Sequence, residues 1–174
     1  MLKFYPYLIS SLFPLNFTGQ PPYSFEEFLN YCIRFVSEKE AEILKNISLE
    51  ISFKAQPHSL LKKWEDFNIA LKDALLEFRA QRLQKSHFGY IKESSYSYLE
   101  LKKDVYFAFK AITPNEQERI LDKLRWQFLE EEEKKYIFSL ETVIIYGLKL
   151  LILLRWENIK KNSNFQTLKE VLEN

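Results

Sequence analysis

The chain has few of the residues that form covalent cross-links, metal sites or phosphate-binding loops. Its 174 residues include one cysteine, two histidines and three glycines. The single thiol, Cys32, excludes an internal disulfide and a metal site built from several thiolates. Three glycines cannot furnish a phosphate-cradling loop, and the common nucleotide-binding and zinc-protease motifs are absent from the sequence. We therefore expect no catalytic residue, no cofactor and no metal site.

An excess of one charge is also missing. Twenty-five Lys and Arg against 24 Asp and Glu give a net charge of +1, so neither nucleic acid nor an anionic membrane surface is the expected partner. Hydrophobic residues make up 47% of the chain and aromatic residues 16%, which is typical of a folded protein rather than a disordered one.

No apolar run is long enough to cross a membrane. The most apolar stretch, FSLETVIIYGLKLLILLRW at residues 138–156, has its apolar centre from Thr142 to Leu154 with Lys149 inside it. A bilayer requires roughly 20 apolar residues, and a lysine in its middle would be costly. We expect a central core helix here. The N-terminal apolar segment is interrupted by Pro6, which does not fit a secretory leader and favours a cytoplasmic protein.

Helix-start signals and apolar periodicity predict an all-α protein, a bundle of about six or seven helices. Ser24 with Glu27 and Ser37 with Glu40 are capping-box pairs, and Thr113 before Pro114 is a third start signal. The second of these helices is expected to continue to Phe53, until Pro57 stops it. Residues 4–13 fit either an extended strand or a short helix.

The longest predicted helix runs from Ser59 to about Gln84, and its apolar residues recur at spacings of four and three: Leu60, Trp64, Phe67, Leu71, Ala74 and Phe78. Further helices are expected at Tyr98–Lys110, from Pro114 to a frayed end at Glu130–Glu133, and at Phe165–Leu172. In the helix from Tyr98 the apolar side is predicted to hold Leu101, Val105, Ala108 and Ile112. One domain, 1–174, is expected, with possible halves 1–84 and 98–174 and a hinge at 85–97.

The candidate site residues are charges that lie among apolar neighbours. Arg79, Arg125, Glu141 and Lys149 interrupt or end apolar stripes. Either their stems pack while their heads reach solvent, or they form an internal network, for example Arg79 or Arg125 with Glu141, that fixes how two halves meet. The histidines His58 and His87 are expected on the surface, and Cys32 is expected to be a buried thiol.

Four blocks of the sequence resemble a small bacterial family encoded in operons for V/A-type rotary ATPases of the spirochaete and chlamydia kind. The blocks are YPYLISSLFP, PPYSFEEFL, WEDFNIALKDALLEFRAQRL and FSLETVIIYGLKLLILLRW. In the last block Tyr146, Lys149, Leu150, Arg155 and Trp156 fit the family pattern, and Ser139 stands where an acid is common. In the long helix the fitting residues are Trp64, Leu71, Ala74, Leu75, Arg79 and Ala80. Lys72-Asp73 replaces the usual Arg-Asn there, which puts a bidentate contact at Lys72 in doubt.

The resemblance implies a part in the ATPase without showing which part. Because the sequence has no catalytic motif, we expect a non-catalytic subunit or accessory protein. The family is similar, more distantly, to the helical C subunit (the d-type subunit), a socket between the rotating central stalk and the membrane ring. Expected partners are therefore these ATPase subunits, with the protein peripheral to the inner face of the plasma membrane through them alone. Exposed aromatics around Tyr5, Tyr7, Tyr90 and Tyr96 would supply the binding surface.

Two alternatives stay open. One is an assembly factor that joins the same complex transiently. The other is a helical protein that binds or converts a small molecule in a pocket between the halves, lined by Arg79, Arg125 or Lys149.

Overall fold

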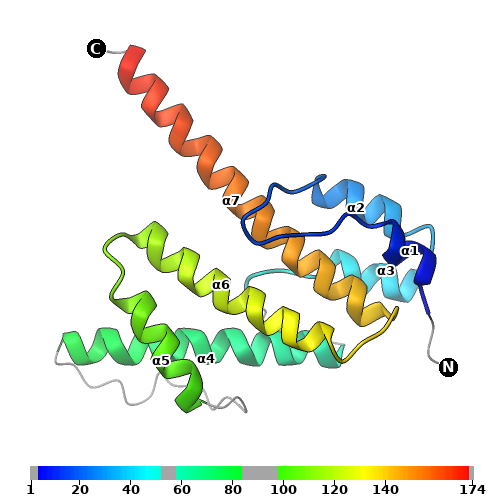
Figure 1. Cartoon of the computed structure of the whole chain (residues 1–174), viewed down its shortest axis with the longest axis horizontal. Coiled ribbons are helices and arrows are strands. Elements are labelled where there is room, and N and C mark those ends of the chain that lie inside the picture. The colour runs from blue at the N-terminus through cyan, green and yellow to red at the C-terminus, as the bar shows by residue number, and fades with distance from the viewer. Residues whose placement is uncertain (1–3, 52–57, 84–97, 173–174) are drawn as a thin grey trace. The chain divides into compact units, whose positions relative to one another are not determined.

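The computed structural model describes residues 4–51, 58–83 and 98–172, and in the last range it describes side chains from residue 101 to residue 162. Figure 1 traces the chain. The predicted hinge at 85–97, with His87, Tyr90 and Tyr96, lies outside the described residues.

Within this part of the chain the structure has seven helices and no strand, which confirms the all-α prediction. The helices are α1 (Pro6–Ser11), α2 (Phe25–Cys32), α3 (Glu38–Lys45), α4 (Ser59–Arg82), α5 (Tyr98–Phe109), α6 (Pro114–Glu133) and α7 (Leu140–Leu172). None of the described helices is both long and apolar enough to cross a membrane.

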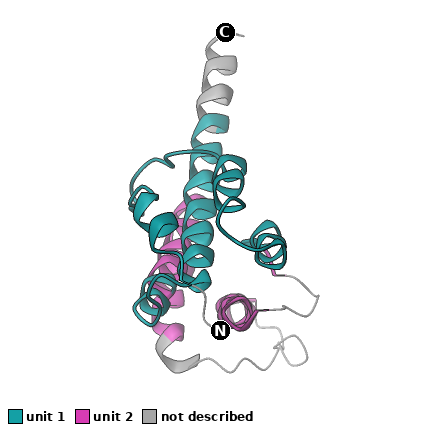
Figure 2. Cartoon of the chain, turned by 90° about the vertical axis from the view of Figure 1, so that its right-hand side faces the viewer, with its two compact units in different colours: residues 1–49, 129–174 teal, residues 50–128 magenta. Residues whose placement is uncertain are grey.

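The chain forms two compact units, coloured separately in Figure 2. Unit 1 contains residues 1–49 and 129–174, and unit 2 contains residues 50–128. These units group the chain differently from the predicted halves, because α4 pairs with α5 while α7 pairs with α2 and α3. The single domain with halves 1–84 and 98–174 stays a prediction.

Unit 1 is built on α7, against which α2 and α3 pack (Figure 1). The predicted core helix is confirmed, since the side chains of its first half are fully buried: Val143, Ile144, Ile145, Leu148, Leu150 and Ile152. Its continuation differs from the prediction. The expected separate helix at Phe165–Leu172 is wrong because α7 runs unbroken to Leu172. The residues between, Asn162, Ser163 and Asn164, are weak helix formers, but without proline or glycine they do not end the helix.

Gly147 lets α7 approach its neighbours closely. A Cβ at this position would lie 2.5 Å from Cδ1 of Ile47 and 3.1 Å from Cε1 of Phe28. Phe28 comes from α2, and Ile47 follows α3. Both are buried. The glycine therefore marks where α7 contacts α2 and the segment after α3.

The N-terminal segment is helical, which settles the choice between strand and helix. Pro6 occupies the first turn of α1, where its fixed φ suits a helix and its missing N–H costs nothing. The backbone N–H of Tyr5 donates to the carbonyl of Phe138 at 2.6 Å. Phe138 has a φ of 50°, in the left-handed region that favours glycine. This hydrogen bond ties the start of α1 to the turn before α7.

The two predicted capping boxes are present in unit 1. Ser24 Oγ accepts from the N–H of Glu27 at 3.2 Å, and the N–H of Ser24 donates to Glu27 Oε2 at 2.7 Å. Ser37 N–H donates to Glu40 Oε2 at 2.8 Å. The predicted extension of α3 to Phe53 is wrong, because the helix ends at Lys45. Asn46 turns the chain there, and its side-chain amide donates to the carbonyl of Glu42 at 2.8 Å.

Unit 2 is organised by α4, which packs along α5. The predicted stripe of α4 is confirmed: Leu60, Trp64, Phe67, Leu71 and Ala74 are buried, and Phe78 stacks on Phe109 of α5 at 5.6 Å. Phe128 of α6 stacks on Phe67 at 4.4 Å and lies 6.1 Å from Trp64. His58 caps α4, its Nδ1 accepting from the N–H of Leu60 at 3.3 Å.

The apolar side predicted for α5 is correct except at its end. Leu101, Val105 and Ala108 are buried, but Ile112 is 93% exposed. The reason is that α5 ends at Phe109, so the helical spacing no longer applies at residue 112. Ile112 lies in the turn before α6, whose predicted cap is confirmed by the N–H of Glu116 donating to Thr113 Oγ1 at 3.2 Å.

The acidic end of α6 is helical through Glu133, within the range predicted for the end of the helix, and the expected fraying there stays a prediction. Two lysines just past it offset the unfavourable charges. Lys134 pairs with Glu131 at 2.6 Å, and Lys135 pairs with Glu132. Cations at a helix C-terminus interact favourably with the helix dipole, so the ion pairs support the last turn.

Candidate functional site

A pocket in unit 1 brings together two of the predicted site residues, Tyr146 and Lys149. We call it the α1 pocket. Its volume is about 280 Å³, and it is lined by Ile9, Leu12, Phe13, Pro14, Leu15, Glu133, Thr142, Tyr146 and Lys149. The apolar wall comes from the end of α1 and the segment after it. The polar wall comes from α7 and the last residue of α6, because positions 142, 146 and 149 share one face of a helix.

Lys149 forms the charged part of this wall. It is buried, and its Nζ donates to Glu133 Oε2 at 2.5 Å. Glu133 is partly exposed, so this pair is not fully withdrawn from water. The Lys149 side chain itself is only 9% exposed, so the interpretation that its head reaches solvent is wrong: the ammonium ends in an ion pair with the last residue of α6.

Tyr146 links α7 to two distant segments. Its hydroxyl donates to the carbonyl of Phe13 at 2.9 Å and lies 2.6 Å from the hydroxyl of Tyr23. Because the Tyr146 proton is directed at the carbonyl, Tyr23 is the donor to Tyr146. Burial is the main cause of the raised pKa of Tyr146, and the hydrogen bond with Tyr23 raises it further. Burial also raises the pKa of Tyr23. Both phenols therefore act as neutral hydrogen-bonding groups.

Thr142 adds a polar atom that the surrounding protein leaves unused. Its Oγ1 is buried and has no hydrogen-bond partner among the described residues. Such a group costs stability unless something bonds to it. The α1 pocket thus offers an apolar wall, a hydroxyl and an ion pair, which suits binding of a small polar group.

Exposed apolar side chains flank the contact between Tyr5 and the turn before α7, and we call them the α1 face. It comprises Phe4, Tyr7, Ile137 and Phe138, which are 63%, 85%, 71% and 40% exposed. The hydrogen bond from Tyr5 to Phe138 brings the two segments together. Large apolar groups gathered on a surface are typical of interaction sites.

Tyr5 itself does not belong to this face, so the prediction that it is exposed is wrong. Its ring is buried, and its hydroxyl donates to Glu40 Oε1 at 2.7 Å. The pKa of Tyr5 is raised mainly by burial. The hydrogen bond to Glu40 and the negative charge of Glu40 raise it further. Tyr5 therefore anchors α1 to α3, and Tyr7 supplies the exposed ring.

Arg125 lies in a buried polar network of unit 2. Its Nε donates to Asn68 Oδ1 at 2.7 Å, and its Nη1 donates to Asp122 Oδ1 at 2.7 Å. The amide of Asn68 donates to the carbonyl of Trp64 at 2.8 Å. Since Asn68, Asp122 and Arg125 are all buried, the interpretation that the Arg125 head reaches solvent is wrong. The network joins α4 to α6.

The other predicted residues lie in separate places. Arg79 is exposed, and its Nη2 donates to Gln117 Oε1 at 3.1 Å. Glu141 accepts from Ser139 Oγ at 2.5 Å. A pair between Glu141 and Arg79 or Arg125 would join the two units and stays a prediction. The guanidinium of Arg155 lies 5.9 Å from the ring of Trp156, and both side chains are half-buried.

The sequence pattern did not point to several residues that complete these sites. Tyr23, Glu133 and Thr142 complete the α1 pocket, and Asn68 with Asp122 completes the Arg125 network. For Asn68 and Asp122 a signal existed, since each is a polar residue at a position where helical spacing requires burial. Tyr23 and Glu133 gave no local signal, because their partners are distant in the chain.

The described ranges contain no group of three His, Cys, Asp or Glu side chains suited to hold a metal ion. Cys32 is buried as predicted, and burial raises the pKa of its thiol to about 12. At neutral pH it is a neutral apolar group rather than a nucleophile.

Comparison with known proteins gives one finding. The sequence model of a family described as a protein of unknown function (DUF2764) matches residues 98–174, which is less than half of the chain and covers α5, α6 and α7. No curated protein and no solved structure matches the chain.

Proposed function

We propose that the protein is a non-catalytic subunit or accessory protein of a bacterial V-type rotary ATPase, located at the inner face of the plasma membrane through its partners. Its role would be that of a connector related to the C subunit, between the central stalk and the membrane ring. The proposal rests on the four sequence blocks that resemble the ATPase-operon family, together with the surface of unit 1.

The α1 face is the observation that carries the binding role. Burying apolar surface contributes roughly 25 cal/mol per Å², so exposed rings and aliphatic chains contribute most when a partner covers them. Interface cores are enriched in aromatic residues, and three of the four residues of this face are aromatic. Tyr5 holds the face in place, because it is fixed by its N–H to Phe138 and by its hydroxyl to Glu40. A partner would therefore meet a preformed surface.

Affinity capture from native membranes tests the proposal. The wild-type chain is expected to bring down ATPase subunits, and the double variant Tyr7→Asp/Ile137→Asp is expected to lose them. Phe107→Asp is the matched control, since Phe107 is 66% exposed on α5, outside the α1 face. Capture by the double variant equal to that by the wild type would show that this face is not the contact. Absence of the protein from intact, gently isolated ATPase would exclude the stalk role.

A transient assembly factor uses the same contacts but leaves the finished complex. Quantitative mass spectrometry separates the two roles. A stalk subunit is present at a fixed ratio to the other stalk subunits in mature enzyme, whereas an assembly factor is found only with incomplete complexes.

The α1 pocket favours one further candidate, a small-molecule site. Thr142 supplies a buried hydroxyl without a partner in the described part of the chain, next to the Lys149–Glu133 pair. A screen of small polar metabolites by thermal shift tests this candidate. A true ligand raises the melting temperature of the wild type and has a smaller effect on Thr142→Val, which keeps the shape and removes the hydroxyl.

A further inference from the structure

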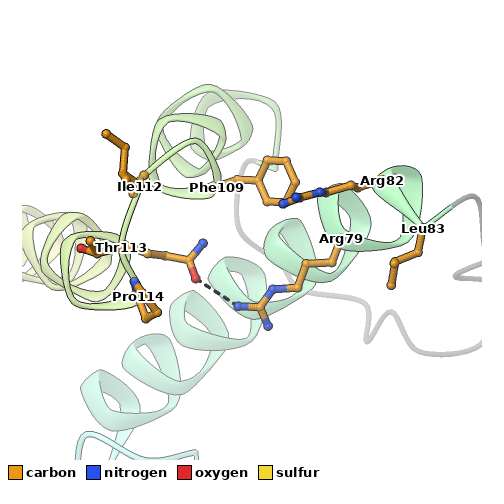
Figure 3. Close-up of a pocket in the computed structure, with 9 residues that line it drawn as sticks. Arg79, Arg82, Leu83, Phe109, Ile112, Thr113 and Pro114 are labelled. Atoms are coloured by element: carbon orange, nitrogen blue, oxygen red, sulfur yellow. Dashed lines mark hydrogen bonds between the residues drawn. The ribbon is translucent and has the colours of Figure 1, made fainter.

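Unit 2 has a second pocket, formed by the last turn of α4, the end of α5 and the turn before α6 (Figure 3). We call it the arginine pocket. Its volume is about 470 Å³, and it is lined by Arg79, Arg82, Leu83, Phe109, Ala111, Ile112, Thr113, Pro114 and Gln117. We propose that it binds an acidic segment of a partner protein whose carboxylates are flanked by apolar side chains.

Among the described residues, no carboxylate pairs with the two arginines of this pocket. Arg79 and Arg82 are three residues apart on α4 and line the same pocket. The hydrogen-bond acceptor of Arg79 is the neutral amide of Gln117, and Arg82 has no hydrogen-bond or ion-pair partner among the described residues. Elsewhere in unit 2, Lys102 pairs with Glu77 at 2.6 Å and Arg125 pairs with Asp122. The arginine pocket therefore has two cations available to a carboxylate.

The acid in the first turn of α6, Glu116, is hydrogen-bonded to the backbone of the turn. Glu116 Oε2 accepts from the N–H of Ile112 at 3.2 Å, and the N–H of Glu116 donates to Thr113. This arrangement holds the turn in shape. The positive end of the α6 dipole adds to the potential of the two guanidinium groups.

Gln117 positions the first of these groups. Its Nε2 donates to the carbonyl of Ala108 at 3.2 Å, which orients its Oε1 toward Arg79. An arginine has five N–H donors in a fixed fork, so one bond to Gln117 leaves the others for a carboxylate. The side chain is thus partly preorganised, which lowers the entropy lost on binding.

The apolar lining of the pocket is the reason why we expect apolar side chains beside the carboxylates of the ligand. Ile112 is 93% exposed and Leu83 is 65% exposed, although both are large apolar side chains. Pro114 and Phe109 continue this lining. Because both arginines and the two apolar side chains are exposed, the pocket does not enclose a small ligand as most small-molecule sites do. An extended protein segment fits it better, and arginine is common at the centre of such interfaces.

The test is a fluorescence anisotropy titration of the whole chain with a labelled nine-residue peptide. The acidic peptide carries Asp-Glu between Leu and Phe, and its matched control carries Asn-Gln at the same positions. The wild type is expected to bind the acidic peptide at least about tenfold more tightly than the amide peptide, and more weakly as salt increases.

Matched variants locate the site. Arg79→Gln/Arg82→Gln is expected to weaken acidic-peptide binding at least about tenfold. The control, Lys72→Gln/Lys103→Gln, removes the same amount of charge from exposed positions of α4 and α5. This control is expected to leave the peptide affinity unchanged. Circular dichroism melts confirm that both variants are folded. Arg79→Glu/Arg82→Glu is expected to bind a Lys-Lys version of the peptide instead.

Equal binding of acidic and amide peptides would overturn the proposal, as would equal losses in the two Gln variants or no binding by the wild type. A failure of the peptide-binding proposal can be distinguished from a failure of the proposed ATPase role. The double variant Tyr7→Asp/Ile137→Asp changes unit 1 only and is expected to keep the peptide affinity of the wild type.

Discussion

At the scale of single residues, Gly147 shows how the lack of a side chain allows a helix to approach its neighbours closely. A glycine inside a helix costs about 1 kcal/mol relative to alanine, so its presence in α7 needs a reason. The reason is space, since Cδ1 of Ile47 lies 2.5 Å from the place of a Cβ. A buried side chain there must move before any substitution is accepted.

Gly147→Ala is expected to lower the free energy of unfolding by about 1 kcal/mol, because overpacking exceeds the gain in helix propensity. In an Ile47→Val background, which removes Cδ1, the same change is expected to be neutral or stabilising. Urea unfolding of the four proteins of this double-mutant cycle measures the coupling. Strictly additive effects would show that Ile47 does not limit the space.

Phe138 provides a second test, because its φ of 50° is unfavourable for any residue with a Cβ. Phe138→Gly and Phe138→Ala both remove the ring, and they differ only in the Cβ. The glycine variant is expected to be more stable than the alanine variant by about 1 kcal/mol, the reverse of the order in a helix. Thermal and urea unfolding measure the difference. An alanine variant as stable as the glycine variant would mean that this turn relaxes freely.

At the scale of elements, the Arg125 network defines how α6 packs on α4. Asp122 is fully buried, and its carboxylate is paired with the guanidinium of Arg125. Arg125→Met is expected to lower the free energy of unfolding by about 3–5 kcal/mol, because it takes the paired cation away from a buried carboxylate. Arg119→Met, at an exposed position of the same helix, is the control and is expected to change stability by less than about 0.5 kcal/mol.

A second variant separates the charge from the packing. Arg125→Met/Asp122→Leu removes both charges and is expected to recover much of the lost stability. If the double variant is less stable than Arg125→Met alone, the shape of the polar pair matters more than its charge balance.

Most elements could be predicted because their signals are local. The α4 stripe is a spacing within one helix, and the Ser24–Glu27 box is a contact over three residues. The errors arose where a local pattern was extended past its end, as at Lys45 and at Ile112. The sites were harder. Tyr146 and Lys149 stood out as unusual in a core helix, but their partners come from segments far away in the sequence.

At the scale of the whole molecule, the groups with raised pKa values make unit 1 sensitive to alkaline pH. Burial raises the pKa of the Cys32 thiol from its ordinary 9.0 to about 12, and burial raises the pKa of Tyr5 and Tyr146 above the ordinary 10.0. The folded state favours the neutral forms, and the unfolded chain loses these protons first. Their contribution to stability is therefore complete below about pH 9 and is lost as pH rises toward 12 and beyond.

Urea unfolding between pH 7 and pH 11 is expected to show stability falling above pH 9. The Cys32→Ala variant, which lacks one of these groups, is expected to have a shallower decline, although its stability at pH 7 is lower because of the cavity. A decline as steep as that of the wild type would show that the thiol does not contribute.

The pairing of helices within the two units has a practical consequence for the stretch that the family comparison matches. Residues 98–174 carry α5 without α4, and α7 without α2 and α3, so both would expose the sides on which they normally pack. Produced alone, this fragment is expected to aggregate, whereas production together with residues 1–97 is expected to yield a soluble complex of the two pieces. A soluble, cooperatively melting 98–174 fragment would contradict this. Truncations made to the boundaries of the matched stretch would therefore remove the helices against which α5 and α7 pack.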